Sequence, residues 1–586
     1  MEIAKKMINL IIDGKNVSVE EGTSILEAAR KIDIDIPTLC FLKEINEVGN
    51  CRMCLVEIDG VRGYKASCVY PVEEGLKVRT NTKDLIETKR EILELILSAH
   101  EKKCLTCVRS TNCRLQDLCR RFEIPDLNYE GAMPEAVLDD ASECIVRNTA
   151  KCILCRRCVN VCKNVQGVSA ISVMNRGFNS RVGVALNMSI KKSTCVGCGQ
   201  CILHCPVAAL TEKSNVKGLK EALADPTKHV VVQTAPSVRA AIGEEFGMPI
   251  GSLVTGKMVS SLRKIGFDKI FDTDLGADIT IMEEATEFIS RLKNGGTLPM
   301  ITSCSSGWIT FAEKFYPEQL NYLSTTKSPM EILGTLIKTY YADKMKIDPK
   351  DIYSVALMPC SAKKAEILRE QLKLENGLQA VDNVVTTREM ARMLKESNID
   401  LSICDDEEFD DPLGIATGAG HIFGATGGVM EAALRSVSYL LDGTEIKNVE
   451  FKSVPGFKNI READIEIAGK VHKIAVVQGL LSVSKVMDEI KAGTSKYSFI
   501  EAMTCPGGCV NGGGQPLVNE YKASKIDVRA LRTKALYTAD KEAKFRKSHE
   551  NPNVKEIYKE FLGEPNGKRA HELLHTKYNK QDTYVD

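Results

Sequence analysis

Two cysteine-rich runs of nearly identical spacing carry the clearest chemistry in this sequence. They are CILCRRCVNVC, which begins at residue 152, and CVGCGQCILHCP, which begins at residue 195. A tight loop of this kind can place three thiolates around one face of an iron–sulfur cube, while the fourth thiolate must come from elsewhere. The repeat therefore predicts two [4Fe-4S] clusters. Two structural zinc sites are the alternative, but zinc does not usually need four closely spaced thiolates in tandem.

The spacing also predicts how the thiolates are shared between the two clusters. Each run has the pattern C-x2-C-x2-C-x3-C of two-cluster ferredoxins, in which the last cysteine of a run binds the other cluster. The first predicted ligand set is Cys152, Cys155, Cys158 and Cys205. The second predicted set is Cys195, Cys198, Cys201 and Cys162.

Two further ligand sets lie upstream. The first has the spacing C-x10-C-x2-C-x13-C and consists of Cys40, Cys51, Cys54 and Cys68. The second comes from HEKKCLTCVRSTNC and consists of His100, Cys104, Cys107 and Cys113. By their chemistry both sets suit zinc as well as iron–sulfur clusters. Both segments resemble the large iron–sulfur subunit of respiratory NADH dehydrogenase, which implies a [2Fe-2S] cluster on the first set and a [4Fe-4S] cluster on the second.

Composition limits the other interpretations. Among 586 residues, Lys+Arg and Asp+Glu both number 78, so net charge gives no argument for binding nucleic acid or an anionic membrane. No apolar stretch approaches the roughly 18 residues that span a bilayer, and the N-terminus lacks a signal-peptide pattern. We therefore expect a cytoplasmic protein whose 22 cysteines serve metals or redox chemistry. Cys119, Cys144 and Cys404 fit no ligand set and are predicted to be small buried hydrophobes.

The elements that must position these ligands begin with a small sheet. Residues 1–82 alternate apolar and polar residues between turn signals, with a first strand over 7–12 and a helix over 24–31. The segment 84–100 has apolar residues at helical spacing. That helix would deliver His100 to its cysteine set.

The remaining chain changes character twice. The cysteine-dense part, before residue 215, has few long periodic segments, so metal must substitute for much of its core. From about residue 228, apolar strand runs such as HVVVQTAPSV alternate with amphipathic helices, which indicates a long α/β region. We therefore predict an α+β multidomain chain. Its predicted domains are a β-grasp ferredoxin-like [2Fe-2S] domain (1–82), a His/Cys3 [4Fe-4S] domain (83–125), a two-[4Fe-4S] ferredoxin domain (140–214) and a large α/β domain (228–586).

Three segments of the C-terminal half resemble the active site of [FeFe]-hydrogenases. They are TSCSSGW (302–308), MPCSAKKAE (358–366) and EAMTCPGGCVNGGGQ (501–515). The second and third match the family patterns MPCxxKxxE and ExMxCxGGCxxGGGQ at every fixed position. With the N-terminal cluster set, the whole chain resembles the large monomeric clostridial type. The resemblance implies reversible, heterolytic H2 chemistry, in which 2 H+ and 2 reduced ferredoxins form H2 and 2 oxidised ferredoxins.

The same resemblance implies an H-cluster in the α/β domain. In this family a [4Fe-4S] cube is bridged through a cysteine sulfur to a di-iron unit that carries CO, cyanide and an azadithiolate, and maturation proteins assemble it. Cys509 would supply the bridging thiolate, and Cys360 and Cys505 would bind the cube. Lys363 would donate a hydrogen bond to one cyanide. The residues implied around the rest of the di-iron unit are Ala235, Pro236, Ser237, Met358, Pro359, Phe423 and Met503.

A proton route is implied as well. Glu284, Glu287 and Arg291 lie at spacings of three, four and seven, which is one face of a helix. Alone, they would fit a solvated helix face with one salt bridge. With Ser324 and Cys304 they match the family's proton route position by position, which favours a relay of groups that both donate and accept protons.

The first motif departs from the family pattern TSCCPxW. Cys304 takes the position of the proton-relay cysteine, Ser305 that of a cube ligand and Ser306 that of the proline. Either Ser305 binds the cube through oxygen, or a local shift makes Cys304 the ligand at the expense of the relay. We favour Ser305 because the rest of the relay is intact, and a hard alkoxide should lower the potential and the retention of the cube. Met330 is a second departure, where close relatives carry glutamine.

Two other classes of function compete with a catalytic hydrogenase. One is a non-catalytic relative, such as an H2 sensor or an assembly protein. The other is an electron-transfer subunit of an NADH-dehydrogenase-like or bifurcating complex, for which the N-terminal clusters alone would suffice. The expected partner is ferredoxin or a ferredoxin-linked complex, since no G-x-G-x-x-G motif in a βαβ context indicates direct use of NAD(P)H.

Overall fold

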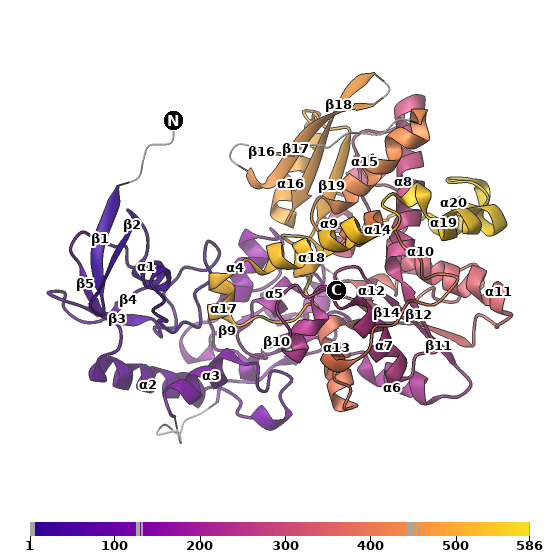
Figure 1. The fold of residues 1–586 in the computed structure, drawn as a ribbon. Helices are drawn as coiled ribbons and strands as arrows, with labels where there is room; N and C mark the ends of the chain where they lie inside the picture. Colours follow the sequence, from indigo (N-terminus) through magenta and orange to yellow (C-terminus); the bar gives the residue numbers. More distant parts are fainter. Residues whose placement is uncertain are drawn as a thin grey trace.

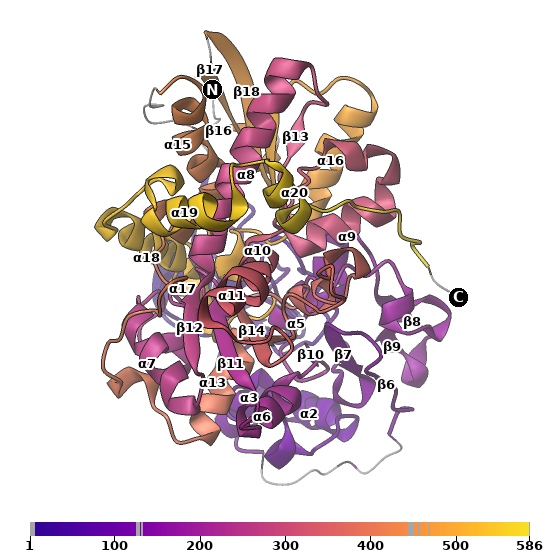
Figure 2. The same cartoon turned by 90° about the vertical axis from the view of Figure 1, so that its right-hand side faces the viewer.

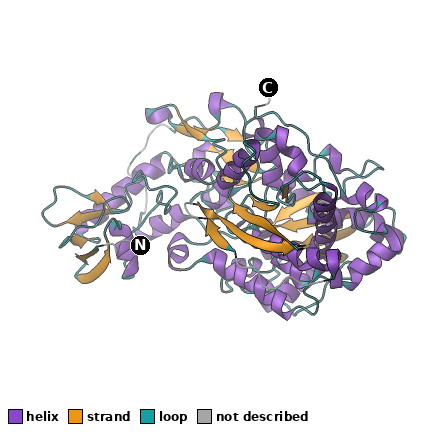
Figure 3. Cartoon of the chain, turned by 90° about the horizontal axis from the view of Figure 1, so that it is seen from above, coloured by secondary structure: helices purple, strands orange, loops and turns teal. Residues whose placement is uncertain are grey.

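The chain forms a small N-terminal lobe and a large body (Figures 1 and 3). This computed structural model describes residues 6–124, 129, 133–443, 451–454, 457–467 and 469–584. The predicted domain limits at residues 1, 125 and 586 lie outside these ranges. The predicted α+β multidomain class is confirmed. No helix within the described ranges has both the length and the apolar character needed to cross a membrane.

A five-stranded sheet with the order β2-β1-β5-β3-β4 builds the N-terminal lobe. Its strands are β1 (Met7–Ile12), β2 (Lys15–Glu20), β3 (Leu55–Ile58), β4 (Lys65–Ala66) and β5 (Lys77–Arg79). The predicted first strand is confirmed, and its alternate residues pack on helix α1 (Ile25–Lys31). This helix starts one residue later than predicted because Ser24 is its N-cap, whose hydroxyl accepts from the Glu27 amide.

Short elements hold the cysteine-dense part of the chain. Its helices are α2 (Lys83–Ser98), α3 (Arg114–Arg121), α4 (Arg157–Asn164) and α5 (Gln200–Leu203). Its strands are β6 (Leu138–Asp139), β7 (Ile145–Asn148), β8 (Ser172–Met174), β9 (Arg181–Gly183) and β10 (Leu210–Glu212). Cysteine thiols make up much of the core here, together with apolar side chains. The short elements and the many thiols in the core agree with the expectation that metal replaces part of the hydrophobic core here.

Two sheets organise the large body. The first is fully parallel, with the order β12-β11-β14-β15, from β11 (His229–Thr234), β12 (Lys269–Asp272), β14 (Ile352–Met358) and β15 (Asn383–Thr386). The second has the order β13-β19-β18-β17-β16, from β13 (Met300–Ile301), β16 (Lys452–Val454), β17 (Phe457–Ile467), β18 (Lys470–Gln478) and β19 (Phe499–Met503). Strands β13, β19 and β18 run parallel, so their carboxyl ends lie at one edge of the sheet.

Every predicted active-site motif follows the carboxyl end of a parallel strand. The segment with Ser237 follows β11, Cys360 follows β14, Cys304 follows β13 and Cys505 follows β19. In open α/β sheets, ligands bind in the crevice outside these strand ends. The topology therefore brings together motifs that lie far apart in the sequence.

Helices cover both sheets. The helices of the body are α6 (Val216–Ala224), α7 (Thr255–Ile265), α8 (Thr273–Asn294), α9 (Ser306–Phe315), α10 (Pro329–Leu336), α11 (Ala342–Met345), α12 (Lys363–Glu366), α13 (Thr387–Glu396), α14 (Gly418–Ile422), α15 (Gly428–Asp442), α16 (Leu480–Lys491), α17 (Glu520–Lys525), α18 (Val528–Glu542), α19 (Pro552–Ile557) and α20 (Lys568–Leu574). Figure 2 shows α8 running from β12 in the first sheet toward β13 in the second. Because α8 packs on α10, α14 and α15, most of its residues are buried.

A buried ion pair joins Lys364 of the second motif to Glu389 of α13. Lys364 Nζ lies 2.8 Å from Glu389 Oε2, and both side chains have no exposed surface. The same ammonium donates to the Lys213 carbonyl oxygen at 2.6 Å, so it also joins α12 to the cluster-binding part of the chain.

We expect Lys364→Met to lower the free energy of unfolding by about 3–5 kcal/mol, because it leaves the Glu389 carboxylate buried without its counter-charge. Urea denaturation followed by circular dichroism measures the change. The matched control is Lys373→Met, which removes a surface pair with Glu370 and should cost less than about 1 kcal/mol. Equal midpoints for the two variants would contradict the expected role of this pair.

Candidate active site and cluster sites

The N-terminal lobe brings the first predicted ligand set together. Cys54 Sγ and Cys68 Sγ lie 3.2 Å apart, and the Cys51 amide donates to Cys40 Sγ at 3.4 Å. Three of the four cysteines are buried and Cys51 is half-buried. Four convergent soft sulfur atoms fit a [2Fe-2S] cluster by their chemistry.

The second predicted set lines a cavity of about 270 Å³. His100, Cys104, Cys107 and Cys113 all contribute to it, and His100 reaches it from the loop just after α2. Cys119 on α3 is half-buried and packs against the apolar core of this part of the chain, in line with the predicted small hydrophobe, but it also lines the same cavity. The Cys144 and Cys404 side chains are buried, as predicted.

The two ferredoxin-type runs exchange their last cysteines in space. One small cavity is lined by thiols of the first run together with the last thiol of the second run: Cys152, Cys155, Cys158 and Cys205. Cys201 lies near Cys195 and Cys162, whose charges add to the burial that raises the pKa of the Cys201 thiol well above its usual value. The structure therefore groups the first set as the spacing predicts, and of the second set it brings Cys201 near Cys195 and Cys162.

Three cysteines converge where the two sheets of the body meet. Burial raises the pKa of Cys505 well above its usual value, and the nearby thiols of Cys360 and Cys509 raise it further. A side chain at Gly508 would clash, because its Cβ would lie 2.7 Å from the Thr426 amide nitrogen and its φ is +88°. One buried and two half-buried thiols in a glycine-built cradle fit the donor chemistry of an iron–sulfur cube.

Ser305 lies beside these cysteines. Its hydroxyl oxygen lies 2.8 Å from the Thr504 hydroxyl and accepts a hydrogen bond from the Thr504 amide at 3.3 Å. Since Thr504 immediately precedes Cys505, the Ser305 oxygen faces the segment that supplies a predicted cube ligand. Cys304 instead packs against the cluster of Phe423 and Met503.

Apolar and polar residues from both sheets complete the pocket. The predicted residues Ala235, Pro236, Ser237, Met358, Pro359, Phe423 and Met503 are all buried, as is Met330. Sequence reasoning missed Gln515, whose side-chain amide donates to the Ser237 carbonyl oxygen at 3.0 Å and to the Cys509 carbonyl oxygen at 3.3 Å. The last letter of the third motif was the available signal for this residue.

Lys363 is held in place by a carboxylate that sequence reasoning also missed. Its Nζ lies 2.8 Å from Glu366 Oε2 and 2.8 Å from the Ser328 hydroxyl. The hydroxyl of Ser306, at the position of the family proline, donates to the same Glu366 carboxylate. The ammonium therefore has a fixed position 3.5 Å from the Cys304 carbonyl oxygen.

The predicted proton-route residues form a chain from the interior toward the surface. Burial raises the pKa of Glu284 to about 8, and the charge of Glu287 adds to the increase. The Ser324 hydroxyl donates to Glu287 Oε2 at 2.8 Å, and Arg291 donates to Glu287 Oε1 at 2.5 Å. At the inner end, burial raises the pKa of the Cys304 thiol well above its usual value. The charge of Glu284 makes the next largest contribution to this increase.

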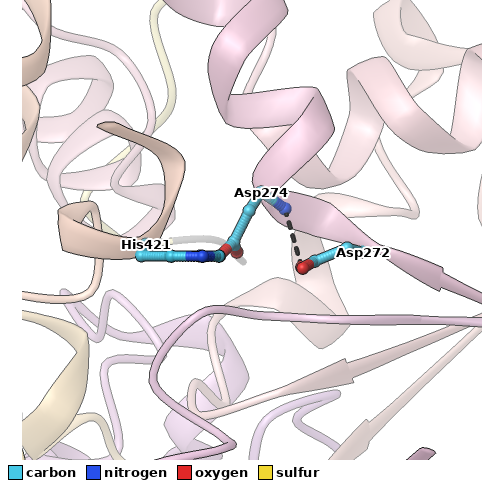
Figure 4. A group of neighbouring side chains, drawn as sticks. All are labelled: Asp272, Asp274 and His421. Atoms are coloured by element: carbon cyan, nitrogen blue, oxygen red, sulfur yellow. Dashed lines mark hydrogen bonds and ion pairs between the residues drawn. The ribbon is translucent and has the colours of Figure 1, made fainter. Parts of the chain in front are cut away.

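A buried ion network links one loop and two helices near the pocket. Figure 4 shows Asp274 between His421 and Asp272, with the Asp274 amide donating to Asp272 Oδ1 at 3.1 Å. His421 Nδ1 lies 2.5 Å from Asp274 Oδ2, and Arg239 Nη2 lies 2.6 Å from Asp272 Oδ1. The Arg239 guanidinium supplies the positive charge that balances the Asp272 and Asp274 carboxylates. The network ties the loop after β11 to the start of α8 and to α14.

Comparisons with known proteins identify related domains along most of the chain. Residues 228–513 match the family model described as the iron only hydrogenase large subunit, C-terminal domain, and residues 526–581 match the iron hydrogenase small subunit. Upstream, residues 5–83 match a 2Fe-2S iron-sulfur cluster binding domain, residues 89–127 match the NADH-ubiquinone oxidoreductase-G iron-sulfur binding region and residues 151–209 match a 4Fe-4S dicluster domain.

Individual hydrogenases also resemble the chain. The NADP-reducing hydrogenase subunit HndD of Solidesulfovibrio fructosivorans is 44% identical over 98% of this chain and 99% of its own length. Iron hydrogenase 1 of Clostridium pasteurianum is 43% identical over 98% of this chain and 100% of its own length. The solved structure of a variant of [FeFe]-hydrogenase HydA1 from Chlamydomonas reinhardtii superposes with a TM-score of 0.57 and 39% identity, covering 62% of this chain and 99% of that one.

Proposed function

Because the chain belongs to the iron-only hydrogenase family, we propose that it forms and oxidises H2 reversibly, with ferredoxin as its electron partner. One observation carries the proposal. The thiols of Cys360, Cys505 and Cys509, of which Cys505 is buried and the other two are half-buried, converge beside Lys363, and the Cys304 thiol lies within the electrostatic influence of the buried Glu284 carboxyl. A simple electron carrier needs cluster ligands but has no use for a proton route.

The residues of the chain have separate tasks in this proposal. An H-cluster, when bound, supplies the iron centre and the amine base for heterolytic H2 chemistry. Cys360, Cys505 and Cys509 would hold it, and Lys363 would hydrogen-bond one of its cyanide groups. The apolar side chains of the pocket keep water away from it.

Proton transfer is assigned to the chain that begins at Cys304. Cys304, Glu284, Ser324 and Glu287 can each both donate and accept a proton, which a relay requires. Glu284 takes protons from the Ser324 and Glu287 side of the chain and passes them to the Cys304 thiol. Arg291 positions Glu287 near the surface through their 2.5 Å contact.

Electrons are proposed to arrive through the ferredoxin-type clusters. Gly197 and Gly199, within the second cysteine run, touch the active-site motifs directly: the Ser361 hydroxyl donates to the Gly197 carbonyl oxygen at 2.7 Å. The Gln200 side chain donates to the Asn511 carbonyl oxygen at 2.9 Å. We propose three accessory [4Fe-4S] clusters and one [2Fe-2S] cluster that pass single electrons to this contact.

One specific finding favours an alternative in which the chain is a subunit of a larger complex. The relative named as a subunit of an NADP-reducing hydrogenase aligns with this chain along its whole length. The chain would then be the hydrogen-forming subunit of a cytoplasmic complex in which another subunit binds the nicotinamide cofactor. Maturation proteins for the H-cluster are required in either case.

Infrared spectroscopy of the matured protein tests the proposal. We expect CO and cyanide bands together with H2 evolution from reduced viologen, and faster H2 evolution from reduced ferredoxin than from NADPH. If the bands were absent after co-expression with maturation proteins, the chain would be a non-catalytic relative. Activity only after addition of a nicotinamide-binding subunit would favour the complex.

The pKa of Glu284, about 8, predicts how activity depends on pH. Below this value the carboxyl is protonated and can pass a proton to Cys304, whereas above it the carboxylate has no proton to give. At a fixed overpotential, H2 formation on an electrode should therefore fall as the pH rises through about 8. The driving force must be held constant, because proton reduction itself becomes harder at high pH. A rate that stays level from about one pH unit below this pKa to one unit above it would show that Glu284 does not limit proton delivery.

A further inference from the structure

The cavity of the His/Cys3 set contains more sulfur than one cluster needs. Besides His100 and the three predicted thiols, Cys119 of α3 lines it. Cys119 is presented by one face of a regular helix, since Leu115, Gln116 and Arg120 line the cavity with it. Burial raises the pKa of the Cys119 thiol, and Cys113 and Cys104 raise it further, which agrees with a position of Cys119 near the ligand set.

His100 provides independent evidence that this cavity holds a ligand position. Its side chain is 8% exposed, and its Nδ1 atom is buried without a hydrogen-bond partner among the described residues. Metal-binding imidazoles usually donate their second ring nitrogen to a carboxylate or a carbonyl group, which fixes the ring. A ring nitrogen that has no partner within the described ranges marks His100 as a residue that can bind a metal centre in this cavity.

The charges around the cavity favour an additional thiolate. Exchange of a neutral imidazole for a thiolate adds one negative charge to the cluster. The basic residues that line the cavity are Lys102, Lys103, Arg109, Arg120 and Lys151, while Glu101 is its only acidic residue within the described ranges. Lys151 Nζ already lies 4.0 Å from Cys107 Sγ. A fourth thiolate would therefore be formed in a positive environment.

We propose that Cys119 is a reserve ligand of the [4Fe-4S] cluster in this cavity and replaces His100 on iron. The proposal rests on the proposed function only in assigning that cluster to this set. In the exchange, the His100 nitrogen–iron bond breaks and a Cys119 sulfur–iron bond forms. The thiol proton of Cys119 passes to the released imidazole, and no electron is transferred. His100 is the ligand replaced because iron in such clusters prefers soft thiolates to imidazole.

The exchange would give this cluster two reduction potentials. Imidazole ligands raise the potential of an iron–sulfur centre relative to thiolates, as in Rieske centres. With His100 bound, the cluster would accept electrons readily, and with Cys119 bound it would hold them less tightly. Cys119 would thereby keep the cluster in place and alter how it exchanges electrons with a partner.

Three variants of the full-length, cluster-loaded protein test the proposal: His100→Ala, Cys119→Ser and the double variant. Iron content, electron paramagnetic resonance and potentiometric titration are the measurements. We expect His100→Ala to keep the cluster with a shifted signal and a more negative potential. The double variant should lose one [4Fe-4S] equivalent, and Cys119→Ser alone should keep the cluster but lose the more negative of its two potentials. The matched control is His100→Ala with Cys404→Ser, because Cys404 is buried far from this cavity, after α13; it should behave as His100→Ala alone.

Two results would overturn the proposal. One is loss of the cluster in His100→Ala to the same extent as in the double variant. The other is retention of the same signal and potential in both. If the wild type and the double variant gave the same [4Fe-4S] signals, this ligand set would hold no such cluster. The cluster assignment within the proposed function would then fail as well. Failure of the reserve ligand alone leaves the wild-type signal and the H2 activity intact.

Discussion

Replacement of Glu284 by glutamine should lower H2 evolution by roughly a hundredfold or more, within the range of general acid–base catalysis. Glu284 is fully buried, and its carboxyl accepts from the Ser303 hydroxyl at 3.3 Å. An amide of the same shape can preserve this contact but cannot release and regain a proton at neutral pH. Protons would then stop one step before Cys304. Viologen-driven H2 evolution measures the loss, and unchanged infrared bands of the H-cluster would show that the cofactor is still present.

Two further variants make the Glu284 result specific. Glu284→Asp keeps a titratable group and should recover part of the activity. Glu283→Gln removes the neighbouring buried carboxylate of α8, which contacts His575 at 2.9 Å and lies outside the proposed chain. Its activity should stay within a few-fold of the wild type. Similar losses in Glu283→Gln and Glu284→Gln would point to a structural defect of α8 instead of a proton relay.

Replacement of Ser305 by cysteine should slow the loss of the H-cluster cube by roughly tenfold or more, since even residues beyond the ligands change metal affinity by that factor. Ser305 aligns with the family's cysteine ligand in the first motif, and its oxygen faces Thr504, next to Cys505. A thiolate is a softer ligand for iron than an alkoxide and should also raise the cube potential. Iron release to a chelator, followed by cube absorbance, measures the retention.

Two alanine variants distinguish the candidate ligands. If Ser305 binds the cube, Ser305→Ala should lower its iron content, while Cys304→Ala should keep the cube and slow proton delivery. If Cys304 is the ligand, the losses should be reversed, and Ser305→Cys should retain iron no longer than the wild type. Redox titration of the three proteins provides a measurement that does not depend on turnover.

Much of the fold followed from local patterns. The first strand over Met7–Ile12 and the strands that lead into the active-site motifs were predictable because their periodicity and turn residues are local properties. The same is true of the tandem cysteine runs, whose spacing predicts that Cys205 joins the thiols of the first run. Element ends were less predictable, as at Ser24, since capping depends on individual hydrogen bonds.

Side-chain environments could not be predicted in this way. Glu366 and Gln515 were visible as motif letters, but their partners Ser306 and Ser237 lie on distant segments. Cys119 was assigned to the core because no spacing rule connects it with His100. The structure places it in the same cavity.

The sequence by itself determined the family, the types of ligand and the grouping of the cysteines, because cluster-binding loops keep their ligands close together in the chain. Only the tertiary structure decided which of these groups share a pocket and in what state of protonation. Glu284 has a raised pKa because burial and the charge of Glu287 disfavour its ionised form. Cys119 gains its proposed role because α3 directs it into the cavity of His100. Both effects arise from contacts and burial that form only when the chain has folded.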